Sequence, residues 1–556
     1  MKKIVLTLVM ACIASMAVAQ VTNEVTPRGW NLTLKKTKAP VIMPAFDMQA
    51  IIDEDVILDA NVDKSYRFAK KFTVDFDLFN SGEWTVLRNG DRIWRLNVKS
   101  PGAKTMNFIF SRYDLPAGAE LFLYNNDRTD KIGPYSNKEN QEDGILGTWI
   151  IYGDNVWLEY YEPKAVKNQG RISIGEVAHG YRGFNKPENS IAKLNESGSC
   201  NVDVNCNPNQ GSTNGVDWST IRDNYRDSVA RIIINGNGLC TGSIVNNTNS
   251  TGTPYFLTAN HCLGTVNGAG TGYPASNWVF GFQWFTTTPQ CATFTNTSGP
   301  FNPTRVLSGA ILRANDDIAD FALFQINQTP PAAWNLYYAG WNRVLSSGNG
   351  QLGMHHPAGD IMKLARNDEA ALPVNTSFNG NSQARMWRIS DWNYGVTEGG
   401  SSGSCLLNTS GQIIGVLSGG SAACSGTNDN GGFDIYGRVD TSWNSFSTNS
   451  RRLSSWLDPS NSNAMQLDGS YAANLSVASE TILNLQVYPN PSNGLVTITL
   501  DEEASYTVYN VSGQVIKQGS FAGLSNQLDI TNVSNGVYFL KVATGTASAT
   551  TKLVKE

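Results

Sequence analysis

Alternating apolar and polar positions recur along the first third of the chain. Residues 84–98 (WTVLRNGDRIWRLNV) and 120–126 (ELFLYNN) follow the period of two that is typical of strands with one buried face. Turn signals separate such runs, among them Asn-Gly at 89–90 and Pro-Ala-Gly at 116–118. Short strands at this spacing predict an all-β sandwich over residues 20–193.

The same alternation returns at the end of the chain, over residues 481–556. Residues 485–500 (LQVYPNPSNGLVTITL), 506–519 (YTVYNVSGQVIKQG) and 535–545 (NGVYFLKVATG) each read as strands bounded by Gly or Asn turns. We predict a small β-sandwich here, preceded by a Ser-, Asn- and Ala-rich linker at 469–480. Composition alone also allows a carbohydrate-binding or spacer module.

The N-terminal apolar stretch has the features of an export signal. MKKIVLTLVMACIASMAVAQ combines two lysines, an apolar run and an Ala-Val-Ala end, which is the pattern of a cleaved signal peptide at residues 1–19. A lipoprotein cut before Cys12 would leave too short an apolar region. No later run approaches the length that spans a bilayer, so we expect a secreted protein without a transmembrane anchor.

Composition then narrows the possible partners. With 556 residues, 41% of them hydrophobic, the chain is long enough for several cores. Its net charge of -5 arises from 47 acids and 42 bases without a long basic run, which disfavours nucleic acid and anionic membranes. We expect a monomer that needs no cofactor.

Cysteine usage singles out the middle of the chain, residues 194–468. Clustered cysteines in an exported protein suit disulfides, and no pair has the close C-x-x-C spacing of structural zinc sites. The odd number after signal removal leaves at least one thiol without a partner in the chain. The seven are Cys200, Cys206, Cys240, Cys262, Cys291, Cys405 and Cys424.

Ser404 stands among small residues, in EGGSSGSC. Such a stretch is often only a tight polar turn. It also suits a nucleophile, because absent side chains let a substrate carbonyl approach and free backbone N–H groups for an oxyanion hole. That reading requires a base and an orienting acid elsewhere.

Histidine is scarce, so few residues qualify as the base. His261 ends the apolar run YFLTANHC, where a disulfide at the next residue would fix its position. His355 and His356 (MHHPAG) point to opposite sides of an extended chain, so we expect structural or subsite roles rather than a metal site. Asp320 precedes the strand-like FALFQI and becomes the natural orienting acid, although a strand-entry Asp is usually a turn residue.

Several segments of this region occur in one order: SGSCNVDVNC, CTGSIVNNT, YFLTANHC, DFALF, YYAGWNR, MHHP, GVTEGGSSGS, YGRV and SSWLDP. In them, residues 194–468 resemble the lysyl endopeptidases, bacterial secreted serine proteases of the chymotrypsin clan. The resemblance implies a chymotrypsin-like double β-barrel. It makes Ser404 the nucleophile, His261 the general base and then acid, and Asp320 the group that orients the imidazole. The backbone N–H groups of Ser402 and Ser404 would form the oxyanion hole.

The resemblance also implies the substrate contacts. Asp434, shortly before YGRV, would lie at the base of the S1 pocket and select a cationic side chain. Ser418, Gly419 and Gly420 would pair with the substrate backbone, with Ser418 replacing a histidine of the family. One carboxylate fits Lys and Arg alike, so the preference for Lys rests on the resemblance.

The family's disulfides map onto three pairs in this sequence and leave one cysteine over. Cys405 stands where these proteases usually have proline, so it should loosen the loop slightly. We expect a buried, inert residue there, with a redox role as the alternative. The implied pairs are Cys200 with Cys424, Cys206 with Cys291, and Cys240 with Cys262.

The segments YPNPSNG, VSGQVI and NGVYFLKV in the tail resemble the C-terminal sorting domain of the type IX secretion system of Bacteroidetes. The implied partner is that secretion machinery, with an extracellular or cell-surface destination. Residues 20–193 then read as a propeptide that assists folding or blocks the cleft. Lys193 lies just ahead of SGSC, so a lysine-specific protease could cleave there and activate itself.

The sequence therefore predicts a secreted serine endopeptidase that acts on proteins or peptides after lysine, made as a zymogen. One alternative is a non-catalytic extracellular binding or adhesion protein on a protease-like fold. The other keeps the chemistry and changes the pocket: a trypsin-like protease of broader basic specificity fits, whereas an acid-directed one would set a substrate carboxylate against Asp434.

Overall fold

The computed structural model divides into two compact units, Met1–Leu475 and Ser476–Glu556. The predicted signal peptide, Lys193 and most of the predicted linker lie outside the residues that it describes. In the described part of the chain, no helix is both long and apolar enough to cross a membrane. The described residues are 25–32, 39–59, 65–183, 197–266, 274–289, 291, 305–378, 381–444, 447–472, 485–500, 503–510, 514–523, 525–543 and 548–556.

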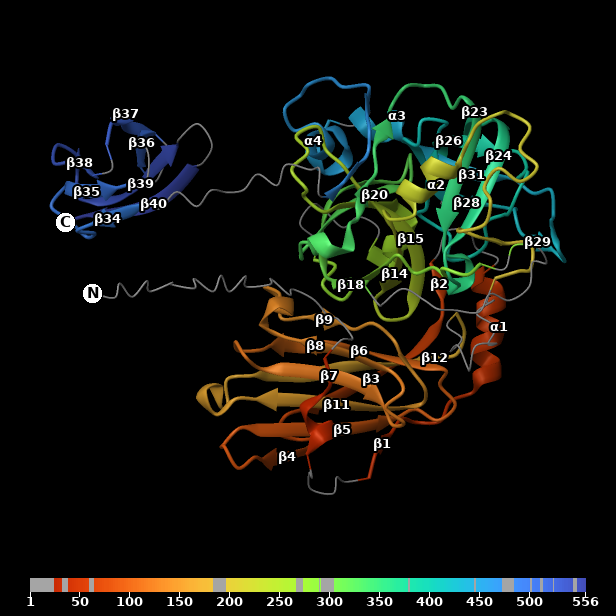
Figure 1. The fold of residues 1–556 in the computed structure, drawn as a ribbon, viewed down its shortest axis with the longest axis horizontal. Helices are drawn as coiled ribbons and strands as arrows, with labels where there is room; N and C mark the ends of the chain where they lie inside the picture. The colour runs from red at the N-terminus through yellow and green to blue at the C-terminus, as the bar shows by residue number, and fades with distance from the viewer. Residues whose placement is uncertain are drawn as a thin grey trace, which may run out of the picture. The chain divides into compact units, whose positions relative to one another are not determined.

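Two sheets form the N-terminal part of the first unit (Figure 1). One has the order β1-β5-β11-β7-β8 with β4 on β5, and the other β10-β6-β12-β3 with β9 on β6. The alternation predicted at 84–98 is a hairpin of β4 and β5 that turns through Gly90 at φ +89°. The strands are β1 (Val41–Ile42), β3 (Ala69–Asp77), β4 (Glu83–Val86), β5 (Arg92–Lys99), β6 (Thr105–Asp114), β7 (Glu120–Asn125), β8 (Lys131–Tyr135), β9 (Leu146–Gly147), β10 (Ile151–Tyr152), β11 (Asn155–Glu162) and β12 (Arg171–Gly180).

The cysteine-containing part of the first unit consists of two larger sheets. The first has the order β18-β17-β14-β15-β16-β20-β19, and the second β13-β24-β23-β27-β28-β31-β26-β25 with β22 on β28 and β32 on β22. The first sheet comprises β14 (Val229–Ile234), β15 (Gly238–Val245), β16 (Tyr255–Ala259), β17 (Val279–Phe282), β18 (Arg305–Ser308), β19 (Ala310–Asp316) and β20 (Phe321–Ile326). The second comprises β13 (Val202–Asp203), β22 (Trp341–Asn342), β23 (Asn349–His355), β24 (Lys363–Ala370), β25 (Leu372–Phe378), β26 (Asn381–Ile389), β27 (Cys405–Leu407), β28 (Ile413–Gly420), β31 (Asp434–Arg438) and β32 (Gln466–Leu467).

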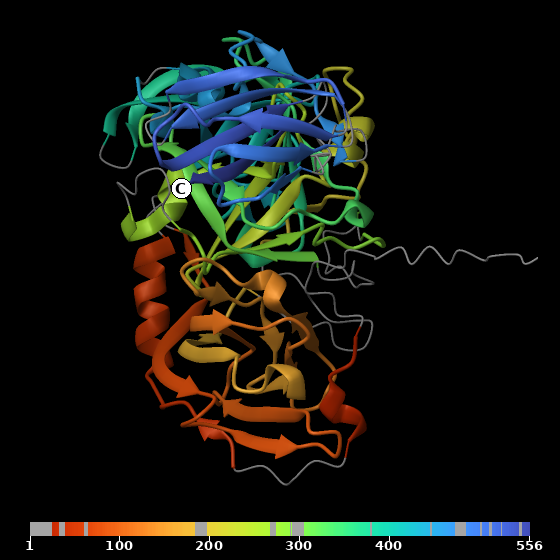
Figure 2. The ribbon, with the colours of Figure 1, turned by 90° about the vertical axis from the view of Figure 1, so that its left-hand side faces the viewer.

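Within the described ranges, helices are few and short. Helix α1 (Met48–Asp59) is the red helix that reaches from the N-terminal sheets toward the yellow-green strands in Figure 2. The others are α2 (Ser219–Tyr225), α3 (Val439–Asn444) and α4 (Ser454–Leu457), with 3-10 turns η1 (Arg28–Asn31), η2 (Asn137–Glu139), η3 (Lys164–Val166), η4 (Asn260–Val266), η5 (Ala332–Trp334), η6 (Pro357–Gly359) and η7 (Asn449–Arg451). Two small pairs join β21 (Tyr337–Tyr338) to β33 (Ser470–Tyr471) and β29 (Cys424–Ser425) to β30 (Asn428–Asp429).

The N-terminal sheets share a hydrophobic core with the outside of the first large sheet. Ile233, Leu239, Val279 and Val306 belong to the same cluster of buried residues as the apolar side chains of β5, β6 and β11. The short strand β2 (Tyr66–Arg67) also pairs with Gly238 and Leu239 at the start of β15. Burial of this apolar surface stabilises the contact between the two parts.

The second unit is a two-layered sandwich around its own core. One sheet holds β34 (Gln486–Tyr488), β35 (Leu495–Thr499) and β38 (Ser525–Asp529); the other holds β36 (Ala504–Asn510), β37 (Val515–Phe521), β39 (Gly536–Ala543) and β40 (Ser548–Lys555). The predicted fold class is thereby confirmed: the chain is mostly β, with a β-rich N-terminal part, the two sheets of a double β-barrel and a C-terminal β-sandwich. The domain boundaries near 193 and 468 remain predictions.

Candidate active site

His261 and Asp320 meet where two neighbouring strands end. Strands β16 and β20 are antiparallel, and Ala259 pairs with Phe321, so the residues just beyond them adjoin. Asp320 Oδ1 accepts the backbone N–H of His261 at 2.9 Å, and its Oδ2 lies 2.8 Å from Nδ1 of the ring. Both side chains are buried. This carboxylate holds the ring in one orientation and fixes its tautomer, leaving Nε2 at the other end.

The Cys240–Cys262 disulfide ties the residue after His261 to β15, with 6.4 Å between the Cα atoms. One potential ligand atom each from Cys240, His261 and Cys262 lies within 4.8 Å of the other two, a grouping that would otherwise suggest a metal site. Because both sulfurs are joined to each other, they do not offer the thiolates that zinc requires. The group braces the histidine instead.

Ser404 directly precedes β27 and is held on both sides by backbone bonds. Gly403 N–H donates to the Leu417 carbonyl at 2.9 Å, and Leu417 N–H donates to the Ser404 carbonyl at 2.8 Å. A Cβ at Gly403 would lie 2.1 Å from Thr258 Oγ1, so only glycine lets the serine loop pack this closely against the end of β16. Ser404 Oγ and His261 Nε2 have no hydrogen-bond partner among the described residues.

One of the two predicted oxyanion amides, that of Ser404, already has a hydrogen-bond partner. Ser404 N–H donates to the Ser401 carbonyl at 3.0 Å, so in this structure that amide is occupied. The Ser402 carbonyl accepts Thr241 N–H at 2.8 Å, which anchors the loop to β15. An oxyanion hole at Ser404 therefore requires the Ser401 carbonyl to turn away.

Asp434 lies at the start of β31 and is 2% exposed. Its Oδ2 accepts hydrogen bonds from Thr397 Oγ1 at 2.6 Å and Trp392 Nε1 at 2.7 Å. Desolvation raises the pKa of this carboxyl to about 6, because burial outweighs the two hydrogen bonds that favour the charge. An uncompensated carboxylate at this depth attracts a cation. The partners Thr397 and Trp392 escaped the sequence analysis, since nothing local marks them.

A cavity of about 300 Å³, the Asp434 cavity, opens onto this carboxylate. Gly419 and Gly420 line it, and a Cβ at Gly420 would come within 2.4 Å of Asp434 Oδ1. The absence of side chains at these two positions keeps the carboxylate accessible. Ser418 is fully buried beside the sulfur of Met386 and does not line the cavity.

Residues of the N-terminal part complete the Asp434 cavity. Leu58, Asp59, Ser65 and Tyr66 line it together with the residues that follow Thr397. A Cβ at Gly399 would lie 3.0 Å from the Tyr66 ring, so the tyrosine packs directly on the serine-bearing loop. Sequence reasoning left open whether this part blocks the site and gave no hint of these residues.

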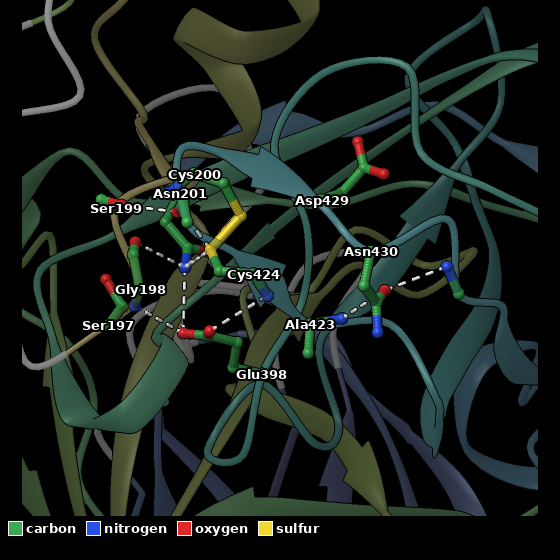
Figure 3. The surroundings of a disulfide bond; sticks show 12 residues. Ser197, Gly198, Ser199, Cys200, Asn201, Glu398, Ala423, Cys424, Asp429 and Asn430 are labelled. Atoms are coloured by element: carbon green, nitrogen blue, oxygen red, sulfur yellow. Dashed lines mark hydrogen bonds between the residues drawn. A yellow bond between two sulfur atoms is a disulfide. The ribbon is translucent and has the colours of Figure 1, made fainter.

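The segment after Lys193 is anchored beside the same loop (Figure 3). Glu398 Oε2 accepts Gly198 N–H at 2.8 Å and Asn201 Nδ2 at 3.0 Å. The Cys200–Cys424 disulfide, drawn in yellow, closes the arrangement. The structure also contains Cys206–Cys291, so its three disulfides are the pairs that the resemblance implies.

The remaining candidates are buried. Cys405 is a free, buried thiol, and burial raises its pKa to about 12, so it is protonated and unreactive at neutral pH. His355 Nδ1 bonds to Ser401 Oγ at 2.8 Å, and His356 Nδ1 to the Asp360 carbonyl at 3.0 Å. Burial lowers the pKa of both rings, that of His355 to about 3, so both are neutral.

Comparison with known proteins agrees with this geometry. Residues 194–437 match the family model of the lysyl endopeptidase C-terminal domain, and residues 486–556 match that of the secretion system C-terminal sorting domain. A lysyl endopeptidase of Pseudomonas aeruginosa is 28% identical over 379 residues, which cover 64% of this chain and 74% of that protein.

Two solved serine proteases show weaker similarity. The thermostable protease AL20 from an extremophilic microorganism is 16% identical, over 38% of this chain and 92% of its own, with a TM-score of 0.23. The secreted protease VesC of Vibrio cholerae is 12% identical, over 59% of this chain and 69% of its own, with a TM-score of 0.25.

The protein is a secreted serine protease of the trypsin-like class. More particularly, residues 194–437 match the lysyl endopeptidase C-terminal domain, and residues 486–556 are a type IX sorting domain that directs the protein to the cell surface or the medium.

Proposed function

We propose that the protein hydrolyses peptide bonds after lysine through a triad of Ser404, His261 and Asp320. The observation that carries the proposal is the two-point bond of Asp320 to His261, at 2.9 Å to the backbone and 2.8 Å to the ring. Among the residues that the structure describes, neither His261 Nε2 nor Ser404 Oγ has a hydrogen-bond partner. These are the two atoms between which a proton must pass.

The reaction follows from these groups. Ser404 Oγ attacks the scissile carbonyl carbon while its proton passes to His261 Nε2, and Asp320 stabilises the resulting imidazolium. Backbone amides of the serine loop, those of Ser402 and Ser404, stabilise the tetrahedral oxyanion. His261 then returns the proton to the leaving amine, and water hydrolyses the acyl-enzyme by the same steps.

Specificity for a basic side chain is supported by Asp434. The buried carboxylate recovers its lost hydration only when a cation enters the Asp434 cavity, so an uncharged guest leaves it unpaired. An acidic guest would be repelled. The preference for lysine over arginine comes from the family resemblance, and the broader trypsin-like alternative differs in that point alone.

We further propose that the protein is a zymogen that cleaves itself near Lys193. Support comes from Leu58, Asp59, Ser65 and Tyr66, which line the Asp434 cavity. A segment at the mouth of a substrate pocket competes with substrate, so blocking the cleft is the favoured role of residues 20–193. A non-catalytic binding protein would have no need for such a cover.

The nucleophile is tested with a fluorophosphonate probe, which phosphonylates only an activated serine. The matured protein should incorporate one equivalent of label at Ser404, and Ser404→Ala should incorporate none. Ser410→Ala, in the exposed turn after β27, is the matched control and should label normally. Labelling that persists in Ser404→Ala would contradict the assignment, and no labelling of a folded, matured wild type would favour the binding-protein alternative.

A further inference from the structure

The hydrogen bond between Ser404 N–H and the Ser401 carbonyl occupies the amide that the proposed mechanism needs. Ser401 in turn is held by a histidine with no part in the triad. We propose that His355 is a positioning residue for the oxyanion-binding loop, acting through the hydroxyl of Ser401. This inference rests on the proposed function and deepens it.

Strand register brings His355 to the nucleophile. β23 pairs antiparallel with β27, with Leu352 opposite Leu407 and Gly353 opposite Leu406. Continuing that register by two residues sets His355 level with Ser404. The last residue of one strand therefore lies beside the loop that precedes the next, and its side chain reaches Ser401.

One bond orients the His355 ring. The side chain is fully buried, Nδ1 lies 2.8 Å from Ser401 Oγ, and Nε2 has no hydrogen-bond partner among the described residues. A buried polar ring with a single polar partner is fixed by that partner. The ring is neutral, so it forms this bond without bringing a positive charge near the serine.

Ser401 is anchored to other residues through its side chain and its N–H, while its carbonyl accepts the Ser404 N–H. Its Oγ also accepts Glu398 N–H at 3.2 Å, and its own N–H donates to the Glu398 carbonyl at 3.0 Å. Gly400 and Gly403, which flank this stretch, have φ of +94° and +84°, a region that glycine adopts without strain. With the hydroxyl fixed as a pivot, rotation of the 401–402 peptide takes the carbonyl away from Ser404 N–H and frees that amide for the oxyanion.

The test compares turnover with the binding of two ligands in the matured enzyme. We measure kcat and KM for a lysine anilide, together with the affinities of a lysine aldehyde and of n-butylamine. The aldehyde forms a tetrahedral adduct with Ser404, whereas the amine fills only the Asp434 cavity. His355→Leu and Ser401→Ala should each lower kcat by about 10–100-fold with KM within about threefold of wild type. Aldehyde affinity should fall in step with kcat, and amine affinity should not change.

Matched variants separate positioning from packing. His355→Asn keeps a hydrogen-bonding atom near the position of Nδ1 and should recover most of kcat. His356→Asn changes an equally buried ring that bonds Asp360 instead of the loop, and it should lower the melting temperature without lowering kcat. If His355→Leu fails to fold, Ser401→Ala, which deletes one hydroxyl, carries the test alone.

Unchanged kcat in both His355→Leu and Ser401→Ala, or a parallel loss of aldehyde and amine affinity, would overturn this inference while leaving the proposed function intact. A wild-type enzyme without Ser404-dependent cleavage would instead overturn the proposed function, and this inference with it.

Discussion

At the scale of a single residue, the buried charge of Asp434 lowers the stability of the fold but serves the proposed function. Burial costs free energy whenever the carboxyl is charged, and Thr397 and Trp392 offset only part of that cost. The charged form is nonetheless the one that binds a cation. Under the proposed function, the buried charge destabilises the free enzyme, and a cationic side chain of the substrate relieves that cost.

Cation binding should depend on pH. Because the pKa of Asp434 in the free protein is about 6, the carboxyl is protonated below that pH and loses its attraction for ammonium. The affinity of n-butylamine for the inactive Ser404→Ala variant should fall about tenfold for each pH unit below about 6 and level off above it. Calorimetric titration between pH 4 and 8 measures this. A flat profile would contradict the role of Asp434.

Replacing Asp434 by asparagine should stabilise the fold and abolish activity. The folded pKa of about 6 exceeds the ordinary value of 3.8, so between these pH values the native state binds more protons and stability falls as pH rises. Asp434→Asn should therefore raise the free energy of unfolding at pH 8 by about 1–3 kcal/mol, with little effect at pH 4. Denaturant unfolding at both pH values checks it, and destabilisation at pH 8 would be inconsistent with this account.

At the scale of elements, the ends of strands and one disulfide position the candidate catalytic residues. The paired ends of β16 and β20 set His261 against Asp320, and the loop that precedes β27 packs through Gly403 against Thr258 near the end of β16. The Cys240–Cys262 disulfide fixes the turn between β16 and the histidine.

Removing that brace should affect catalysis as well as stability. Cys240→Ala/Cys262→Ala should lose about 2–4 kcal/mol of stability and also lower kcat, because the His261 turn gains freedom. Cys206→Ala/Cys291→Ala removes a disulfide of which neither cysteine adjoins a triad residue in the sequence; it is the control and should lose stability alone. Equal kcat in both variants would show that the brace has no part in aligning the histidine.

Sequence patterns identified the strands and the candidate triad because both leave local signals. Alternation marks β4 and β5, His261 follows an apolar run, Asp320 precedes one, and Ser404 stands among small residues. Trp392, Thr397 and Tyr66 carry no such signal, since they reach Asp434 or the serine loop only through the tertiary fold. The Ser401–Ser404 bond is likewise invisible, because it depends on the rotation of one peptide.

At the scale of the whole molecule, the N-terminal sheets and the protease share one apolar interface, and α1 and β2 extend it to the Asp434 cavity. Salt bridges join α1 to the residues after β12 and to β2, among them Arg67 with Asp55 at 2.7 Å and Arg182 with Asp59 at 2.6 Å. The N-terminal residues that line the Asp434 cavity are therefore continuous with the fold of the N-terminal part.

An uncleaved chain should be nearly inactive for this reason. Lys193→Gln should retain the N-terminal part and show a kcat/KM at least about 100-fold below that of matured enzyme, since substrate must displace the cover. Adding Tyr66→Ala should raise that residual activity, and adding Phe79→Ala, at an 84% exposed position, should not. Full activity of the intact Lys193→Gln chain would rule out blocking.

The central claim is lysine-directed catalysis by Ser404, and matched lysine, arginine and glutamate peptide amides test it most directly. We predict cleavage of the lysine amide by the processed protein, weaker or no cleavage of the arginine amide, none of the glutamate amide, and complete loss in Ser404→Ala. Equal cleavage after arginine would keep the mechanism and broaden the pocket. A folded, matured protein that cleaves none of the three in a Ser404-dependent manner would contradict the account.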